Sequence, residues 1–158
     1  MQMVRSTLAL AFLGLLLQGC GGGSDGGSVT RFTGTWHPTS GTVTTTCPGL
    51  APDTSSVTSN LIWSKGISSD LVSTDPSTSC ILNADISGST ASGNGPPCTF
   101  SDGIGGTLTL TITAYTFALA SDGQTAQENG SGTAVDNNSG QTLTCTVSET
   151  ASYQKIGN

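Results

Sequence analysis

Apolar and polar side chains alternate with a period of two residues along several stretches of this chain. In residues 80–87 the even positions are apolar or cysteine, and most odd positions are polar. In residues 107–114 the alternation is complete, with threonine at every odd position and an apolar residue at every even one. Because successive side chains of a β-strand point to opposite faces, each stretch predicts a strand with one buried face.

The phase of this alternation changes after residue 114. The apolar positions that follow are odd, at Tyr115, Phe117 and Leu119. A single strand over residues 107–120 would exceed the usual strand length, and a change of phase requires one extra residue within it. We therefore predict a bulge or a tight turn near residues 113–115.

Weaker alternation predicts the remaining strands, at residues 32–37, 42–47, 58–64, 67–73, 124–134 and 143–153. Turn-forming pairs such as Pro48-Gly49 and Asp122-Gly123 separate several of them. About eight to ten short strands at near-regular spacing predict an all-β domain, an antiparallel meander folded as a small barrel or a sandwich. No stretch after residue 20 has the periodicity of a helix, so no helix is predicted there.

Composition agrees with a β domain and restricts the partners. Charged residues make up 9% of the chain, against about 25% in ordinary soluble proteins. Serine and threonine take their place, and threonine suits the half-buried surface of a sheet. The net charge is −6, with only four lysines and arginines. A basic patch for nucleic acid cannot be built from so few cations, so no nucleic-acid partner is predicted.

The first nineteen residues differ from the rest of the chain. Arg5 precedes an apolar run at residues 8–17, which is too short to cross a bilayer, since a span takes about 20 apolar residues. A basic start, a short apolar run and small residues after it are typical of an export signal. We predict a signal peptide at residues 1–19, a flexible Gly/Ser tether at 20–28 and a single domain at 29–158.

The end of this signal, Leu17-Gln18-Gly19-Cys20, resembles the lipobox of bacterial lipoproteins. Gln18 is a less common residue at its position in that motif. The resemblance implies cleavage before Cys20, a thioether-linked diacylglyceryl group on its sulfur and an acyl chain on its new amine. Two or more acyl chains hold a protein stably on a membrane. The implied location is the bacterial cell envelope, and Gly21, where some lipoproteins carry a retention aspartate, favours the outer membrane.

Four cysteines remain beside the one in the lipobox, at Cys47, Cys80, Cys98 and Cys145. An even number in an exported chain indicates two disulfides, for which three pairings exist. Zinc is a poor alternative, because the sequence has no C-x-x-C pair and one histidine. We favour Cys80–Cys98, which brackets a Gly/Pro-rich loop, and Cys47–Cys145, which joins an early strand to a late one.

Groups for catalysis are sparse and dispersed. The single histidine, His37, fits an ordinary surface residue, and no G-x-S-x-G nucleophile motif occurs. The carboxylates of the domain are scattered, among them Asp70, Asp75, Asp85, Asp102, Asp122, Glu128, Asp136 and Glu149. A glycan-acting enzyme would need two of them to converge in a cleft. We predict a protein without catalytic activity, cofactor or bound metal.

The start of the domain, Gly34-Thr35-Trp36, resembles the G-x-W motif that opens lipocalin-type barrels. In that family the tryptophan closes the barrel floor near a basic residue of a late strand, and Lys155 stands at a corresponding place. The resemblance implies a carrier with an apolar cavity, whose candidate lining residues are Trp36, Trp63, Tyr115, Phe117 and Leu119. Gly-x-Trp also occurs in unrelated β proteins, where the tryptophan is an ordinary core residue.

The sequence therefore predicts an envelope lipoprotein whose β domain binds a partner or has a structural role. The first alternative is a lipocalin-like carrier of a small apolar ligand, and the second is an envelope enzyme that acts on glycans. An interior cavity would separate the carrier from a barrel filled by its own side chains.

Overall fold

The computed structural model describes residues 26–74, 79–101, 106–138 and 141–158. The predicted signal peptide, Cys20 and most of the predicted tether lie outside these residues. The elements are α1 (Gly26–Phe32), β1 (Gly34–Thr46), β2 (Asp53–Ser56), β3 (Leu61–Lys65), β4 (Leu71–Thr74), β5 (Ile81–Ser87), β6 (Thr90–Asn94), β7 (Cys98–Ser101), β8 (Thr107–Leu119), β9 (Thr125–Asn138) and β10 (Gln141–Gly157).

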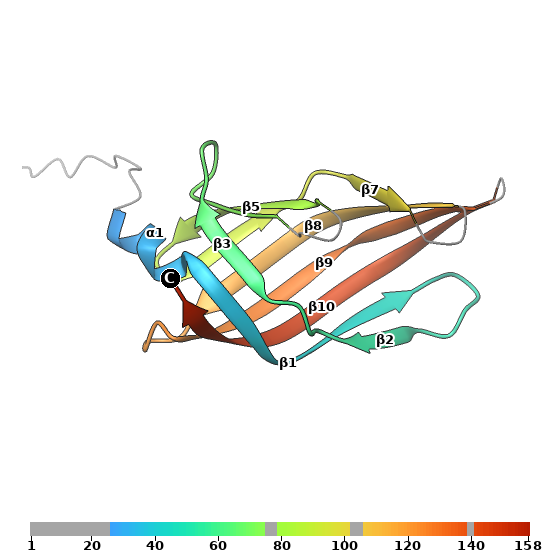
Figure 1. Cartoon of the computed structure of the whole chain (residues 1–158). Coiled ribbons are helices and arrows are strands. Elements are labelled where there is room, and N and C mark those ends of the chain that lie inside the picture. Colours follow the sequence, from blue (N-terminus) through green and yellow to red (C-terminus); the bar gives the residue numbers. More distant parts are fainter. Residues whose placement is uncertain (1–25, 75–78, 102–105, 139–140) are drawn as a thin grey trace, which may run out of the picture.

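Eight antiparallel strands close into a barrel (Figure 1). Their order around the barrel is β1, β3, β4, β5, β6, β8, β9 and β10, and β10 pairs with β1 to complete it. The two remaining strands extend the wall at one end, where β2 pairs with β1 and β7 pairs with β8. The predicted all-β antiparallel fold is confirmed, and of the two alternatives the chain forms the barrel.

The helix α1 lies at the opposite end of the barrel from β2 and β7 (Figure 1). Val29 and Phe32 on α1 are part of the hydrophobic core, so the helix covers this end. The sequence predicts no helix here, and α1 corrects that expectation; residues 26–28 of the predicted tether belong to the helix. Seven residues make only two turns, which show no recognisable period, and burial against the barrel rather than intrinsic propensity stabilises them. In the described part of the chain, no helix has the length and apolar character needed to cross a membrane.

Strand β8 contains the predicted irregularity. Its register against β9 shifts between Ile112 and Ala114, which places the bulge within the range predicted from the change of phase. The extra residue keeps the apolar side chains of both halves on the inner face, since Tyr115 and Phe117 beyond the bulge are buried. The bulge is therefore the reason that two opposite phases occur in one continuous strand.

Both disulfides have the pairing predicted from the sequence. Cys47 is bonded to Cys145, and Cys80 is bonded to Cys98. Cys47 directly follows β1 and Cys145 lies in β10, so the first bond crosses the seam where the barrel closes. The second bond connects the start of β5 to β7, outside that seam.

Candidate functional site

Aromatic rings fill the barrel at the α1 end. Trp36, Trp63, Phe32 and Phe117 are among the largest fully buried side chains. The Trp36 and Phe117 rings meet edge to face with centroids 5.1 Å apart, and Trp63 lies 6.2 Å from the same phenylalanine. These rings form a packed floor, which leaves no room for a ligand among them.

Trp36 and Lys155 are neighbours at the seam between the first and last strands. Trp36 pairs with Lys155 across β1 and β10, and the Lys155 Nζ lies 5.5 Å from the centroid of the Trp36 ring. The same ammonium donates to the backbone oxygen of Arg31 at 3.2 Å. Trp36 Nε1 donates to the backbone oxygen of Phe32 at 2.8 Å. Lys155 thus connects the C-terminal end of α1 to the floor.

A cavity of about 500 Å³ lies inside the barrel beyond this floor. Its aliphatic lining residues are Val57, Leu61, Ile62, Ile81, Leu82, Leu110, Ile112 and Val147. A second hollow of about 340 Å³ shares Leu110 and Val147 with it and continues among the apolar residues Val43, Phe100, Leu108 and Leu143. Of the predicted lining residues only Tyr115 borders the cavity; Trp36, Trp63, Phe117 and Leu119 belong to the packed core instead.

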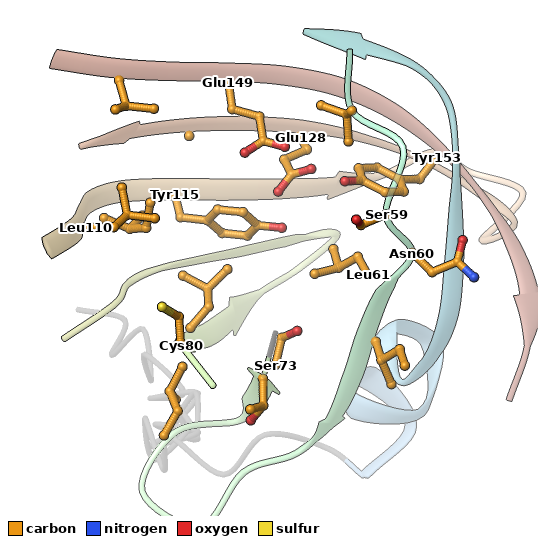
Figure 2. A pocket seen from close by; sticks show the side chains of 18 of the residues that line it. Ser59, Asn60, Leu61, Ser73, Cys80, Leu110, Tyr115, Glu128, Glu149 and Tyr153 are labelled. Atoms are coloured by element: carbon orange, nitrogen blue, oxygen red, sulfur yellow. The ribbon is translucent and has the colours of Figure 1, made fainter. Parts of the chain in front are cut away.

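The polar part of the lining includes two carboxylates. Glu128 of β9 and Glu149 of β10 both face the cavity (Figure 2). In the register of these strands Glu128 is opposite Ala151 and Glu149 is opposite Gly130, so the two glutamates are diagonal neighbours on one face. Strand pairing therefore brings together two acids that lie far apart in the sequence.

Tyrosines surround the deeper of these acids. The hydroxyl groups of Tyr115 and Tyr153 point toward Glu128 (Figure 2). Glu128 is only 5% exposed and Tyr115 only 4%, yet neither Glu128 Oε2 nor the Tyr115 hydroxyl has a hydrogen-bond partner. The Tyr115 hydroxyl is near enough to Glu128 to influence the ionisation of its carboxyl group. Its position nevertheless leaves the Tyr115 hydroxyl and Glu128 Oε2 without a well-formed hydrogen bond. Unsatisfied buried polar atoms cost stability, and a ligand can relieve that cost.

Burial makes both carboxyl groups weaker acids than usual. Desolvation raises the pKa of Glu128, and the hydroxyls of Tyr153 and Tyr115 oppose part of that rise. Desolvation and the neighbouring charge of Glu128 raise the pKa of Glu149 to about 7. The described residues that line the cavity include no lysine, arginine or histidine. No cation among them therefore compensates the two acids.

Gly130 keeps the cavity open beside the acids. A Cβ atom added at this glycine would lie 3.7 Å from Glu149 Cβ and 3.8 Å from Tyr115 Cδ2. Both are ordinary contacts, so the backbone can accommodate a side chain at this position. The absence of one leaves space next to the carboxylates that a larger residue would fill.

We expect the stability of the fold to fall as the pH rises from about 4.5 to about 7. In this range the unfolded chain has released the Glu149 proton, because the ordinary pKa is 4.5, whereas the fold still holds it, because its pKa is about 7. Stability rises with pH only where the unfolded state binds more protons, and here the folded state binds more. Urea unfolding at a series of pH values measures how the free energy of unfolding changes with pH. Glu149→Gln should make the fall of stability with pH shallower, with the raised pKa of Glu128 accounting for what remains, and an unchanged slope in that variant would contradict the burial of the Glu149 carboxyl group.

Other candidate residues lie away from the cavity or have local roles. Asp122 accepts hydrogen bonds from the backbone nitrogens of Gln124 and Thr125, at 2.8 and 3.1 Å, which lower its pKa and fix a turn. His37 is exposed, with its Nδ1 2.9 Å from Asn60 Oδ1. Asp75 and Asp102 lie outside the described residues. The described residues contain no group of three or more potential metal ligands.

Comparison of this chain with protein-family models, with curated proteins and with solved structures finds no match.

Proposed function

We propose that this protein is an envelope-anchored carrier that binds a small, largely apolar molecule inside its barrel. The observation that carries this proposal is the cavity of about 500 Å³, whose lining combines eight aliphatic residues with polar ones. Small-molecule sites in proteins are commonly about 300–1,000 Å³, with mostly apolar linings and a few polar groups. An eight-stranded barrel is just wide enough either to be filled by its side chains or to hold one small ligand. Here the side chains fill only the floor.

The carboxylate pair also meets the geometric condition for a glycan-acting enzyme, since two acids face one cleft. A sugar, however, presents hydroxyl groups that need hydrogen-bonding partners along the whole of its site. Besides the acids and tyrosines, the polar lining residues are Ser59, Asn60, Ser73, Thr74 and Ser131, whereas eight lining residues are aliphatic. Sugar hydroxyls that lie against these aliphatic side chains would be left unpaired. The walls therefore favour an apolar ligand over a glycan.

Filling the cavity is expected to abolish binding without unfolding the barrel. We expect the neutral fluorescent probe N-phenyl-1-naphthylamine to bind the purified full-length protein, and Gly130→Leu to weaken that binding by about tenfold or more. The backbone has room for a side chain at Gly130, so circular dichroism should show the same β fold. Asn129→Leu is the matched control, because Asn129 is the exposed neighbour on the same strand. Equal probe binding by wild type and Gly130→Leu would contradict the cavity as the binding site.

The membrane anchor is a separate part of the proposal. It rests on Leu17-Gln18-Gly19-Cys20 and on the apolar run before it. The Gly/Ser-rich residues after Cys20 would hold the barrel a short distance from the lipid. A carrier fixed in this way collects or delivers its ligand within the envelope instead of diffusing away.

Replacing the lipobox cysteine is expected to remove the lipid. Bacteria that express the wild-type chain should incorporate labelled palmitate into it, and Cys20→Ser should abolish that labelling and release the protein from the membrane fraction. The barrel itself is expected to be unaffected, which thermal unfolding of the variant can verify. Gly19→Ala, which keeps a small residue before the cysteine, is the matched control and should still be labelled. Palmitate incorporation into Cys20→Ser would overturn the anchor.

A further inference from the structure

We propose that the ligand of this cavity carries a protonated amine, which binds between Glu128, Glu149 and Tyr115, with an apolar tail that extends toward the second hollow. This inference rests on the proposed carrier function and names the chemical class of its ligand. Two observations support it independently: the pair of carboxylates that face the cavity, and the buried Tyr115 hydroxyl that lacks a partner (Figure 2).

The acids occupy the deep part of the cavity, next to the floor. On β10 the inward residues that follow Glu149 toward the α1 end are Ala151 and Tyr153, and the Tyr153 ring lies 5.8 Å from the Phe117 ring of the floor. In the other direction Val147 leads from the cavity into the second hollow. The cavity is therefore polar next to the floor and apolar toward the second hollow. A ligand that matches it enters with its polar head first and leaves its tail among aliphatic side chains.

The charges around the head position select a cation. The titratable groups that face it are Glu128 on β9, Glu149 and Tyr153 on β10, and Tyr115 on β8. All four are acidic groups, and the described lining residues supply no basic group. A carboxylate or phosphate head would be repelled by the two glutamates, whereas an ammonium donates hydrogen bonds to them.

An ammonium group also satisfies the atoms that are left unpaired. Glu128 Oε2 has no hydrogen-bond partner, and an ammonium has three hydrogens to donate. The Tyr115 hydroxyl can accept one of them through its oxygen. A neutral alcohol can also pair with both atoms, because its O–H donates to Glu128 Oε2 and its oxygen accepts from the Tyr115 hydroxyl, but it brings no positive charge to the two carboxylates.

Binding of a cation should release a proton. The raised pKa of Glu149, about 7, means that at pH 6 most molecules hold a proton on this carboxyl group. When the ammonium binds, the carboxyl O–H bond breaks, the proton goes to solvent, and the positive charge of the ligand takes its place beside the carboxylate. The affinity for an amine is therefore expected to rise about tenfold between pH 6 and pH 8.

The test compares three probes with the same tail by calorimetry on the full-length protein: n-octylammonium, n-octanol and n-octanoate. We expect n-octylammonium to bind about tenfold or more tightly than n-octanol at pH 8, and n-octanoate to bind more weakly than either. Glu128→Gln and Glu149→Gln should each remove most of the preference for the amine, and Glu149→Gln should also reduce the rise in amine affinity between pH 6 and pH 8. Asp53→Asn, at an exposed carboxylate on β2, is the control for net charge and should bind as the wild type does.

The outcomes separate the two proposals. If n-octanol and N-phenyl-1-naphthylamine bind but n-octylammonium gains no advantage, the amine head is wrong and the carrier function stands. If the amine is preferred equally by wild type and by both glutamine variants, the head binds elsewhere and the inference is overturned. If none of the probes binds, the carrier function itself fails. Should one glutamine variant not fold, the other, together with the pH series on the wild type, decides the same question.

Discussion

Replacing Cys47 and Cys145 together by alanine is expected to lower the free energy of unfolding by about 4–5 kcal/mol. The bond between them encloses a loop with a sequence separation of 98 residues, and in the chain-entropy model a longer closed loop restricts the unfolded chain more. It also ties β1 to β10 at the seam of the barrel. Because small domains are stable by only about 5–15 kcal/mol, this loss removes a large part of the total.

The second disulfide provides the matched control for that experiment. Cys80–Cys98 encloses a separation of 18 residues, for which the same model gives about 3 kcal/mol. Urea unfolding of the two double-alanine variants should therefore rank the seam bond as the more stabilising of the two. The reverse order would mean that strain in the fold or residual structure in the unfolded chain outweighs loop length.

Trp36→Ala is expected to cost about 3–5 kcal/mol of unfolding free energy, as is usual for removal of a buried tryptophan. The indole is fully buried, packs against Phe117 and donates a hydrogen bond to α1, so its removal leaves a hole in the floor and loosens the helix. Urea unfolding should measure this loss of stability, and binding of N-phenyl-1-naphthylamine should report whether the cavity is still formed. An unchanged unfolding midpoint would contradict the packed floor.

Lys155→Met is the matched control for this residue. It keeps a long side chain over the indole and removes the ammonium, whose cation–π contact at 5.5 Å is worth roughly 0.5–1 kcal/mol at an exposed site. We expect Lys155→Met to lower the free energy of unfolding by no more than about 1 kcal/mol. A larger loss than that of Trp36→Ala would show that the charge, and not the buried ring, holds the seam together.

The strands with one buried face could be predicted from the sequence. In β8 and β10 large apolar residues alternate with threonine or serine over many positions, so the pattern is long enough to reveal both the strands and the bulge. The disulfide pairing could also be predicted, because one pair brackets a loop and the other joins strands that become neighbours when a meander closes.

Short elements without large apolar residues could not be predicted. Strand β2 is exposed at all four of its positions, so no alternation marks it. The inward side chain of β6 is the small residue Ala91, which gives only a weak signal. Helix α1 likewise has too few residues to show a period. Tertiary pairing stabilises these segments more than local preference does.

The candidate site has a recognisable signal in the sequence. Glu128 occupies the even phase of β9, which it shares with the buried residues Ala126 and Ala134. Glu149 occupies the odd phase of β10, together with the buried residues Cys145 and Tyr153. A charged residue in the buried phase of a strand is uncommon. Two such residues on consecutive strands indicate a polar site inside the barrel, although only the register shows that they are neighbours.

The aromatic residues were harder to place, because alternation gives the face of a strand but not the depth along the barrel. Trp36, Trp63 and Phe117 face inward as predicted, yet they lie at the α1 end, where aromatic rings fill the interior. Tyr115, one inward position further from the floor than Phe117 on β8, borders the cavity. That depth is set by the strand register and by α1, and neither could be predicted from the sequence.

The most direct test of the carrier proposal is to locate a bound ligand by heteronuclear NMR. Backbone amide shifts of the isotope-labelled protein would be followed while n-octylammonium or N-phenyl-1-naphthylamine is added. The account predicts saturable changes concentrated at the cavity positions of β8, β9 and β10, among them Tyr115, Gly130 and Glu149, and their loss in Gly130→Leu. Changes confined to the outer surface of the barrel, or no change at saturating probe, would contradict it.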